Sequence, residues 1–235
     1  MHEAAALALS SFDTCTLSDA IDKLGFHLHN QGFATPGLRH LAGTMPPGAS
    51  GIAGCVAGYA ATARVRSFEP PMTGHFYFHH TDWWDEINSL PEPRVVVIED
   101  IDRIPGIGAC VGLVATAAYA ALHCQAAVTN GSCRDIPAVH AMNFQLFGAH
   151  VSPSRAYAHL VDHHQPVSLF GLSVRPGDLL AVDGHGLLAI PPEHAGDICA
   201  LAAELAARKR SFVDYCASPD FSIEGLQQQL RQLHS

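Results

Sequence analysis

Between residues 94 and 150 the chain alternates short apolar runs with helical segments, and this alternation restricts the fold more than any other feature. The expected elements are, in chain order, a strand RVVVIED (94–100), a helix from about Gly112 to Cys124, a strand AAVTN (126–130), a helix IPAVHAMN (136–143) and a strand QLFGAHV (145–151). Strands that alternate with helices are typical of α/β proteins. We therefore expect helices packed on a sheet that contains parallel strands.

The flanking segments extend this pattern. Turn compositions separate LLAVD from GLLAIP near residue 184, which predicts a hairpin and makes the sheet mixed. Residues 26–50 are rich in Gly, Pro and His and are expected to be irregular. The other expected elements are a helix over 17–24 with Thr16 or Ser18 as its cap and Gly25 at its end, a buried strand in 51–65, a helix in TDWWDEINSL (81–90), a long helix over 193–215 and a short polar helix over 221–234. The simplest organisation is one α/β domain over 1–235, with helical extensions at both ends.

Composition excludes some classes of function. Hydrophobic residues make up 48% of the chain, so it can bury a sizeable core. The formal net charge is −9, and no basic run occurs, so a nucleic-acid surface is not expected. No apolar stretch is long enough to span a membrane, and the N-terminus lacks the positive region of a signal peptide. Seven cysteines without metal-ligand spacing suit a reducing compartment, and we expect the cytoplasm.

The stretch VTNGSCRDIP, residues 128–137, places Arg134 and Asp135 where a strand passes into a helix. Sites of α/β proteins lie at the carboxyl ends of strands, and the free N–H groups of a helix start favour an anion. Arg134 suits a carboxylate, and Asp135 offers a ligand for Mg²⁺ or Mn²⁺. Together they predict a site for a small 2-oxo acid. The alternative is that Asp135 caps the helix and Arg134 only pairs with an acid.

Three segments in this order resemble one family: LSDAIDKLG, GSCRDIPAV and VRPGDLLAVDGHGLLAIPPEHA. The chain is similar to the family that includes 4-hydroxy-4-methyl-2-oxoglutarate aldolase and the ribonuclease E inhibitor RraA. The likeness runs from about Leu17 to Arg210, which is taken as the core. It implies an αββα domain of the swivelling type with a mixed sheet. It also implies a homotrimer, or a hexamer made of two trimers, with sites between subunits.

In aldolases of this family, the residue matching Arg134 binds the carboxylate and keto group of the substrate, and the residue matching Asp135 holds the divalent metal. Backbone amides near Gly112 stabilise the enolate of pyruvate, a role that suits the start of a helix. The resemblance therefore implies a metal-dependent lyase, either an aldolase or a decarboxylase. The expected substrate-binding residues are Gly112, Leu113, Val114, Asn130, Arg134 and His75, with Arg134 and Asp135 as catalytic residues and Asp135 as the metal ligand.

The sequence departs from the family at positions that matter for metal binding. The aldolases carry an acid at the position of Leu113 and a glutamate near Lys209, where Glu204 is the nearest acid. A leucine cannot bind a metal-bound water, so the metal is expected to be weak or absent unless the ligand or a histidine completes its shell. His75 and His185 are the histidines to test first, although a plain surface or core role is the commoner one. Cys133, beside Arg134, is a candidate nucleophile.

These departures leave two alternatives open. One is an enzyme of the same fold with altered chemistry, another lyase or an isomerase. The other is a non-catalytic regulator that binds a protein partner. The three hypotheses differ in whether pyruvate is released and whether Arg134 is required for it.

Overall fold

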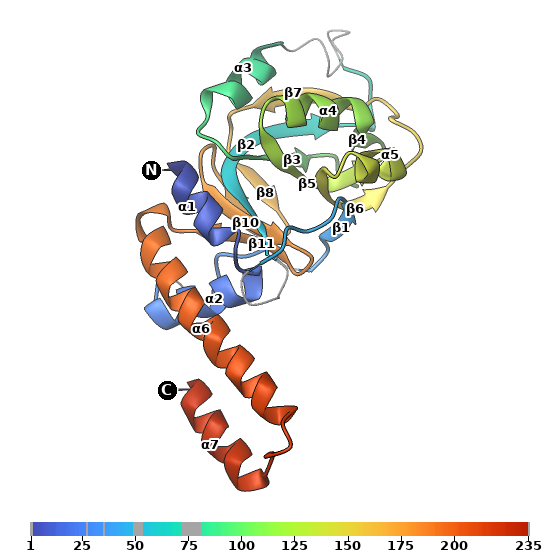
Figure 1. Ribbon diagram of the computed structural model, residues 1–235. Coiled ribbons are helices and arrows are strands. Elements are labelled where there is room, and N and C mark those ends of the chain that lie inside the picture. The colour runs from blue at the N-terminus through green and yellow to red at the C-terminus, as the bar shows by residue number, and fades with distance from the viewer. Residues whose placement is uncertain (1, 27, 35, 49–53, 72–80, 235) are drawn as a thin grey trace.

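The computed structural model describes residues 2–26, 28–34, 36–48, 54–71 and 81–234, and its centre is a mixed β-sheet (Figure 1). The strands of this sheet are β1 (Arg39–Ala42), β2 (Val56–Arg66), β3 (Arg94–Asp100), β4 (Ala109–Val111), β5 (Cys124–Cys133), β6 (Gln145–Val151), β7 (His159–His163), β10 (Leu179–Asp183) and β11 (Gly186–Ile190). Their order is β1-β6-β5-β3-β2-β10-β11, with β4 beside β5 and β7 beside β2. Strands β2, β3, β5 and β6 are mutually parallel, whereas β1, β7 and β10 pair with their neighbours antiparallel.

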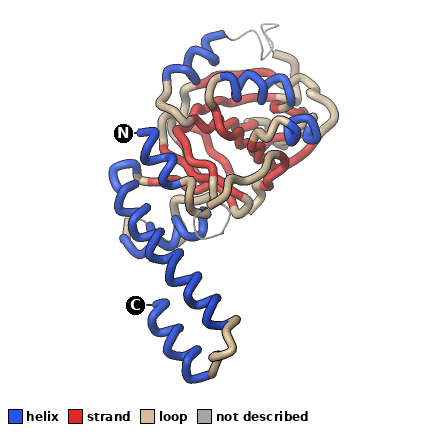
Figure 2. Tube along the Cα trace, in the orientation of Figure 1, coloured by secondary structure: helices blue, strands red, loops and turns tan. Residues whose placement is uncertain are grey.

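Helices cover the sheet at two places. Helices α3 (Thr81–Ser89), α4 (Leu113–Ala121) and α5 (Ile136–Ala141) lie over the parallel strands (Figures 1 and 2). Helices α1 (His2–Leu9), α2 (Thr14–Leu24) and α6 (Ala195–Cys216) pack at the β10–β11 end. A small hairpin, β8 (Val167–Leu169) and β9 (Leu172–Val174), covers the opposite face of the central strands. A 3₁₀ turn, η3 (Pro192–His194), precedes α6, and helix α7 (Ile223–His234) follows it.

The apolar run of β3 explains its central position. Val95, Val96, Val97 and Ile98 are all fully buried, so both faces of the strand are covered. A continuous apolar run, rather than an alternating one, is what a parallel strand between two layers requires. The predicted α/β class with a mixed sheet is confirmed, and so are the strand over 94–100 and the hairpin around residue 184.

The carboxyl ends of the parallel strands meet at one edge of the sheet, and β5 extends further there than predicted. The prediction ended this strand at Asn130, but it continues to Cys133 because β4 pairs beside its last residues. The backbone N–H of Arg134 then donates to the carbonyl of Val111 over 2.9 Å. This pairing places the Arg134–Asp135 dipeptide at the edge that α/β proteins use for their sites.

Several short elements gave no sequence signal. Strands β1, β4 and β7 have three to five residues and little periodicity, and β1 falls in the range expected to be irregular. Helix α2 begins earlier than predicted because Asp13 is its cap: a carboxylate oxygen of Asp13 accepts from the N–H of Thr16 at 2.8 Å. Gly25 ends α2 in the left-handed conformation, as expected.

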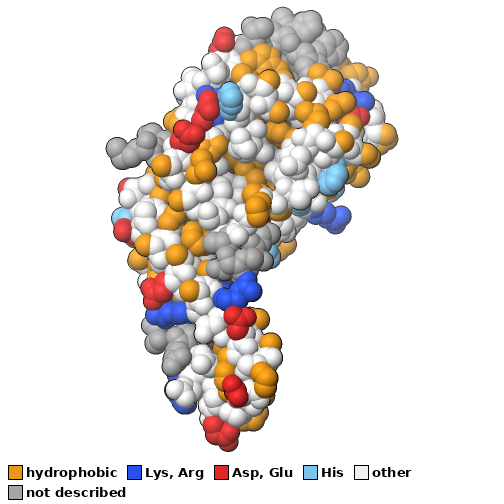
Figure 3. All heavy atoms as spheres, viewed as in Figure 1, with side chains coloured by type: hydrophobic (Ala, Val, Ile, Leu, Met, Phe, Trp, Pro, Cys, Tyr) orange, Lys and Arg blue, Asp and Glu red, His pale blue; other side chains and the backbone are white. Residues whose placement is uncertain are grey.

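The C-terminal helices form an antiparallel hairpin that extends away from the sheet (Figures 1 and 2). Helix α6 packs its first half against α2, and α7 returns alongside its second half. Among the described residues, no helix combines the length and apolar character needed to cross a bilayer. On the face drawn in Figure 3, Lys and Arg side chains lie apart from one another rather than in one patch.

Candidate active site

Arg134 and Asp135 connect the end of β5 to the start of α5. Asp135 has φ 57° and ψ 28°, a left-handed conformation that is uncommon for a residue with a side chain. Its backbone carbonyl still accepts from the N–H groups of Ala138 and Val139, both at 3.0 Å, so α5 begins normally. The left-handed turn directs the carboxylate away from α5, and the side chain makes no capping bond to that helix.

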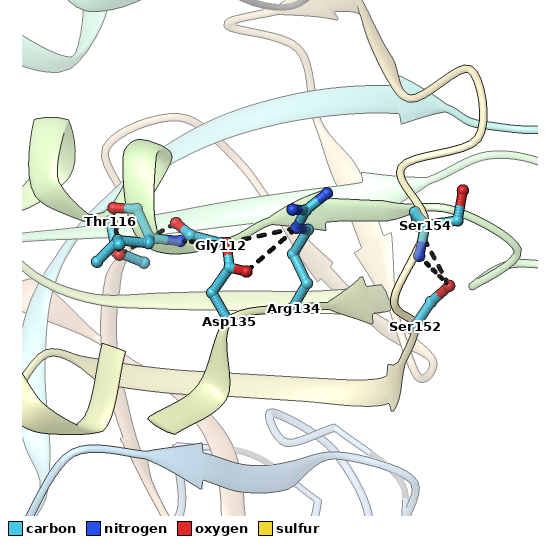
Figure 4. A network of polar contacts seen from close by, with 7 residues as sticks. Gly112, Thr116, Arg134, Asp135, Ser152 and Ser154 are labelled. Carbon is cyan, nitrogen blue, oxygen red and sulfur yellow. Dashed lines mark hydrogen bonds and ion pairs between the residues drawn. The ribbon is translucent and has the colours of Figure 1, made fainter. Parts of the chain in front are cut away.

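The Asp135 carboxylate binds the start of a different helix. Its Oδ2 accepts from the backbone N–H of Leu113, the first residue of α4, at 3.2 Å (Figure 4). Gly112, the N-cap residue of α4, has no side chain that could make this bond. The alternative that Asp135 caps its own helix is therefore wrong for its side chain, whereas the pairing of Arg134 with an acid, which the same alternative expected, is present. The carboxylate instead joins the ends of two neighbouring βα units.

The Arg134 guanidinium contacts Asp135 through one nitrogen. Nε lies 3.4 Å from Oδ1 and 3.3 Å from Oδ2 of Asp135. Among the described residues, its two terminal nitrogens make no hydrogen bond or ion pair, and they point away from Asp135 in Figure 4. The two side chains are 33% and 35% exposed, so solvent and small molecules can reach them. The terminal nitrogens of a guanidinium form a planar fork that matches a carboxylate.

Gly112 makes this close arrangement possible. A Cβ atom at position 112 would lie 2.7 Å from Cγ of Arg134 and 2.8 Å from Oδ2 of Asp135. Both distances are shorter than real carbon contacts, so any side chain here would displace the pair. From the sequence we expected Gly112 to act through its backbone amide. Its steric role could not be predicted, because it depends on the contact of Gly112 with Arg134 and Asp135, which lie in a different loop.

The start of α4 lies beside Arg134 and Asp135 and presents backbone N–H groups and apolar side chains to them. The first N–H groups of a helix have no partner within the helix, and here the Leu113 group is used by Asp135. The side chains of Leu113 and Val114 are 36% and 61% exposed. The arrangement offers helix-start amides, an open guanidinium and an apolar rim to a small anion.

Two other candidate residues, Asn130 and His185, make their contacts elsewhere. Asn130 uses its side chain to fix the end of β3: its Oδ1 accepts from the N–H of Asp100 at 2.7 Å, and its Nδ2 donates to the Asp100 carbonyl at 3.1 Å. His75 lies outside the described residues. His185 follows β10, which runs antiparallel to β2, so it lies at the opposite edge of the sheet from Arg134 and contacts Asp183 at 3.1 Å.

Cys133 is not placed to act as a nucleophile. Its side chain is fully buried, and burial raises the pKa of its thiol well above the ordinary value. Only a thiolate is an effective nucleophile. The suggestion drawn from its position beside Arg134 is therefore not supported, because adjacent residues of a strand point to opposite sides of the sheet.

The described residues do not form a set of ligands for a resident divalent metal. They contain no group of three or more His, Cys, Asp or Glu side chains that could hold an ion. Lys209, near the position of the family's glutamate, forms an ion pair with Asp19 at 2.6 Å, and Glu204 pairs with Arg208 within α6. Asp135 is the acid at the site, and it already accepts hydrogen bonds from Leu113 and Arg134.

Comparison with known proteins shows the family to which this chain belongs. The family model described as Aldolase/RraA, or RraA-like, matches residues 14–189. A protein of Halalkalibacterium halodurans, named "Putative 4-hydroxy-4-methyl-2-oxoglutarate aldolase", is 32% identical to this chain over 93 residues. The matched region is 37% of this chain and 44% of that protein. The chain spans less than half of the length of the curated relatives that it matches.

Solved structures agree with the fold. An uncharacterized protein from Pseudomonas syringae pv. tomato superimposes with a TM-score of 0.71 at 22% identity, covering 97% of this chain and 93% of that one. RraAS2 of Streptomyces coelicolor, an unusual member of the RNase ES inhibitor RraA family, superimposes with a TM-score of 0.63 at 19% identity, covering 85% and 90%. At these identities the likeness establishes the fold alone.

Proposed function

Because this chain belongs to the Aldolase/RraA family, which includes both aldolases and non-catalytic inhibitors, we propose that it is a lyase acting on a small 2-oxo acid. One observation carries the proposal: within the described part of the chain, two guanidinium nitrogens of Arg134 make no hydrogen bond or ion pair and lie beside the start of α4. A bidentate contact from this fork would hold the substrate carboxylate. The family resemblance supplies the reaction type, which is cleavage of a carbon–carbon bond with a pyruvate enolate as intermediate.

The residues of this chain suit charge stabilisation at such an intermediate. In a 4-hydroxy-2-oxo acid the C4 hydroxyl would give its proton to solvent and the C3–C4 bond would break, so that C4 leaves as an aldehyde or ketone; in oxaloacetate the same bond would release CO₂. The electron pair of that bond would form the C2=C3 double bond of the enolate and place negative charge on the keto oxygen, and a proton from solvent at C3 would then give pyruvate. Helix-start amides at α4 and the positive charge of Arg134 would stabilise the developing oxyanion. Asp135 holds Nε of Arg134 and the N–H of Leu113 and thereby fixes both elements of the site.

We propose a smaller role for the divalent metal than the family resemblance implies. Among the described residues, Asp135 alone does not fit a resident Mg²⁺ or Mn²⁺. We propose that an ion binds only together with a chelating 2-oxo acid, whose two oxygens would add to the few ligands that the described residues offer. The resemblance also leads us to propose a homotrimer or hexamer, which light scattering of the purified protein would test.

Pyruvate release from a panel of 4-hydroxy-2-oxo acids and oxaloacetate, with and without Mg²⁺ or Mn²⁺, tests the lyase proposal. We expect release by the unaltered protein and loss of most of it in Arg134→Ala. The matched control is Arg175→Ala, which removes an exposed arginine elsewhere and should leave the rate unchanged. If no compound in the panel yields pyruvate, the lyase proposal is wrong.

A second candidate function is a regulator that binds a protein. The observation in its favour is that α4 exposes the apolar side chains of Leu113 and Val114 where the aldolases carry an acid. Exposed apolar side chains beside an arginine are common at the centre of protein interfaces. A purified RNase E-type nuclease should then be inhibited by this protein, and Val114→Asp should abolish the inhibition while leaving Arg134 in place.

A further inference from the structure

A cavity lies at the same edge of the sheet, separate from Arg134 and Asp135. It has a volume of about 860 Å³ and is lined by the end of β2 and by the loop that follows β3. Arg66 and Arg103 face it together with the apolar side chains of Phe68, Ile104 and Ile107. Cavities of this size typically hold small organic ligands.

Two hydrogen bonds of Ser152 link Ile107, which lines the cavity, to Cys133, the residue before Arg134. The carbonyl of Ile107 accepts from the hydroxyl of Ser152 at 3.3 Å, and the N–H of Ser152 donates to the carbonyl of Cys133 at 3.0 Å. Figure 4 shows Ser152 on the far side of Arg134 from Asp135. Neither Arg134 nor Asp135 lines the cavity, so its ligand would not be the 2-oxo acid held by Arg134.

The cavity is lined by two arginines and two acids, and the hydrogen bonds of these side chains differ. Within the described residues, the guanidinium groups of Arg66 and Arg103 make no ion pair or hydrogen bond. The Asp102 carboxylate accepts from the N–H and hydroxyl of Ser67 at 2.7 and 3.1 Å, and from the N–H of Phe68 at 2.8 Å. Glu69 is the other acid in the lining. In a chain with a net charge of −9, two arginines in one cavity that have no partner among the residues the structure describes favour an anionic ligand.

The apolar part of the lining is exposed to an unusual degree. Phe68 is 61% exposed and Ile104 is 67% exposed, and both stand at the cavity. Leaving such large apolar side chains in water forgoes the free energy of burial, which a ligand with an apolar body would recover. The combination of unengaged guanidinium groups with an apolar wall matches an amphipathic acid.

The loop is held in place before any ligand arrives. Asp100 accepts from the N–H groups of Asp102 at 3.1 Å and Gly106 at 2.8 Å, and the N–H of Gly108 donates to the hydroxyl of Ser67 at 3.0 Å. These bonds, with those of Asp102, fix the loop to the ends of β2 and β3. A site whose backbone is already ordered loses less entropy when a ligand binds.

We propose that this cavity binds an amphipathic organic acid, whose carboxylate or phosphate head contacts Arg66 and Arg103 and whose apolar body packs against Phe68, Ile104 and Ile107. The site is independent of the reaction at Arg134. Octanoate is the probe for a carboxylate head and octyl phosphate the probe for a phosphate head. Acetate and octanol each retain one half of the expected ligand.

Isothermal titration of the full chain tests the proposal. We expect at least one of the two octyl acids to bind about tenfold or more tightly than acetate or octanol, because either half alone loses one class of contact. The double variant Arg66→Gln/Arg103→Gln and the single variant Ile104→Glu should each weaken this binding about tenfold. All three residues are exposed, so folding should be retained, and thermal melting checks it.

Two control variants separate this site from the proposed active site. Arg175→Gln, at an exposed arginine elsewhere, and Arg134→Gln should both leave octyl-acid binding unchanged. The proposal is overturned if neither acid binds, if the double variant binds as tightly as the unaltered protein, or if Arg134→Gln loses the binding. Failure of pyruvate release, with octyl-acid binding intact, would count against the lyase proposal alone.

Discussion

Asp135 stands at the N-cap position of α5, yet its carboxylate accepts from the N–H of Leu113 at the start of α4. One acid therefore connects two helix starts, through its backbone carbonyl for α5 and its side chain for α4. The left-handed backbone at Asp135 makes this possible, because it turns the side chain toward the neighbouring βα unit. Strained backbone of this kind is often found at functional sites.

Gly112→Ala is expected to disable the Arg134–Asp135 pair. The new Cβ would lie 2.7 Å from Arg134 Cγ and 2.8 Å from Asp135 Oδ2, so both side chains must move. We expect binding of oxalate, a 2-oxo acid analogue, to weaken about tenfold or more, since a bidentate contact tolerates little displacement. Calorimetric titration with oxalate measures this loss.

The matched control for this variant is Gly196→Ala. An added Cβ there meets nothing within 4 Å, and Gly196 lies in the first turn of α6. Replacement of glycine by alanine in a helix stabilises it by about 0.5–1 kcal/mol. Gly196→Ala should therefore keep oxalate binding and melt at the same or a higher temperature. Equal losses in the two variants would contradict the steric role of Gly112.

Leu113→Asp is expected to create a metal site, which the described residues do not otherwise form. Leu113 is the first residue of α4 and is partly exposed, so a carboxylate there stays solvated and also favours the helix start. Together with Asp135 it would supply two oxygen ligands for a divalent ion. We expect Mn²⁺ affinity, measured by electron paramagnetic resonance, to rise about tenfold or more. Val114→Asp adds the same charge one residue further along, and an equal rise there would show that charge alone is responsible.

The longer apolar strands and the Arg134–Asp135 junction could be predicted from the sequence because each depends on a local pattern, whereas the short strands β1, β4 and β7 could not. The apolar run of β3 and the Pro137 signal for α5 are visible in a few neighbouring residues. The use of Asp135 to cap α4 was not predictable, because it depends on two loops that meet only in the folded sheet. The engagement of Asn130 with Asp100 was missed for the same reason, since 30 residues separate them.

Asp100 gives the protein a pH dependence of stability with a defined sign. Burial raises the pKa of Asp100 above its ordinary value of 3.8, and bonds from the N–H groups of Gly106 and Asp102 oppose the shift. A raised pKa means that the folded chain holds this proton more tightly than the unfolded chain. The resulting stabilisation is fully present below about pH 3.8 and is lost as the pH rises through the raised pKa.

Urea unfolding of Asp100→Asn beside the unaltered protein, over a series of pH values, measures this effect. The variant loses one acceptor oxygen for a loop N–H and should be less stable by about 1–3 kcal/mol at low pH. Because asparagine does not titrate, the difference between the two proteins should shrink as the pH rises through the window. A difference that widens with rising pH would show that the pKa of Asp100 is lowered rather than raised.

Cys133 is expected to be inert toward alkylation in the folded protein, although it adjoins Arg134. Its thiol is fully buried, and burial raises its pKa well above the ordinary value, so little thiolate forms at neutral pH. Cys216 is exposed and serves as the internal control. Brief treatment with iodoacetamide followed by peptide mass spectrometry should label Cys216 and leave Cys133 unmodified until denaturant is added. Labelling of Cys133 in the native protein, or loss of pyruvate release in Cys133→Ala without loss of folding, would restore it as a candidate nucleophile.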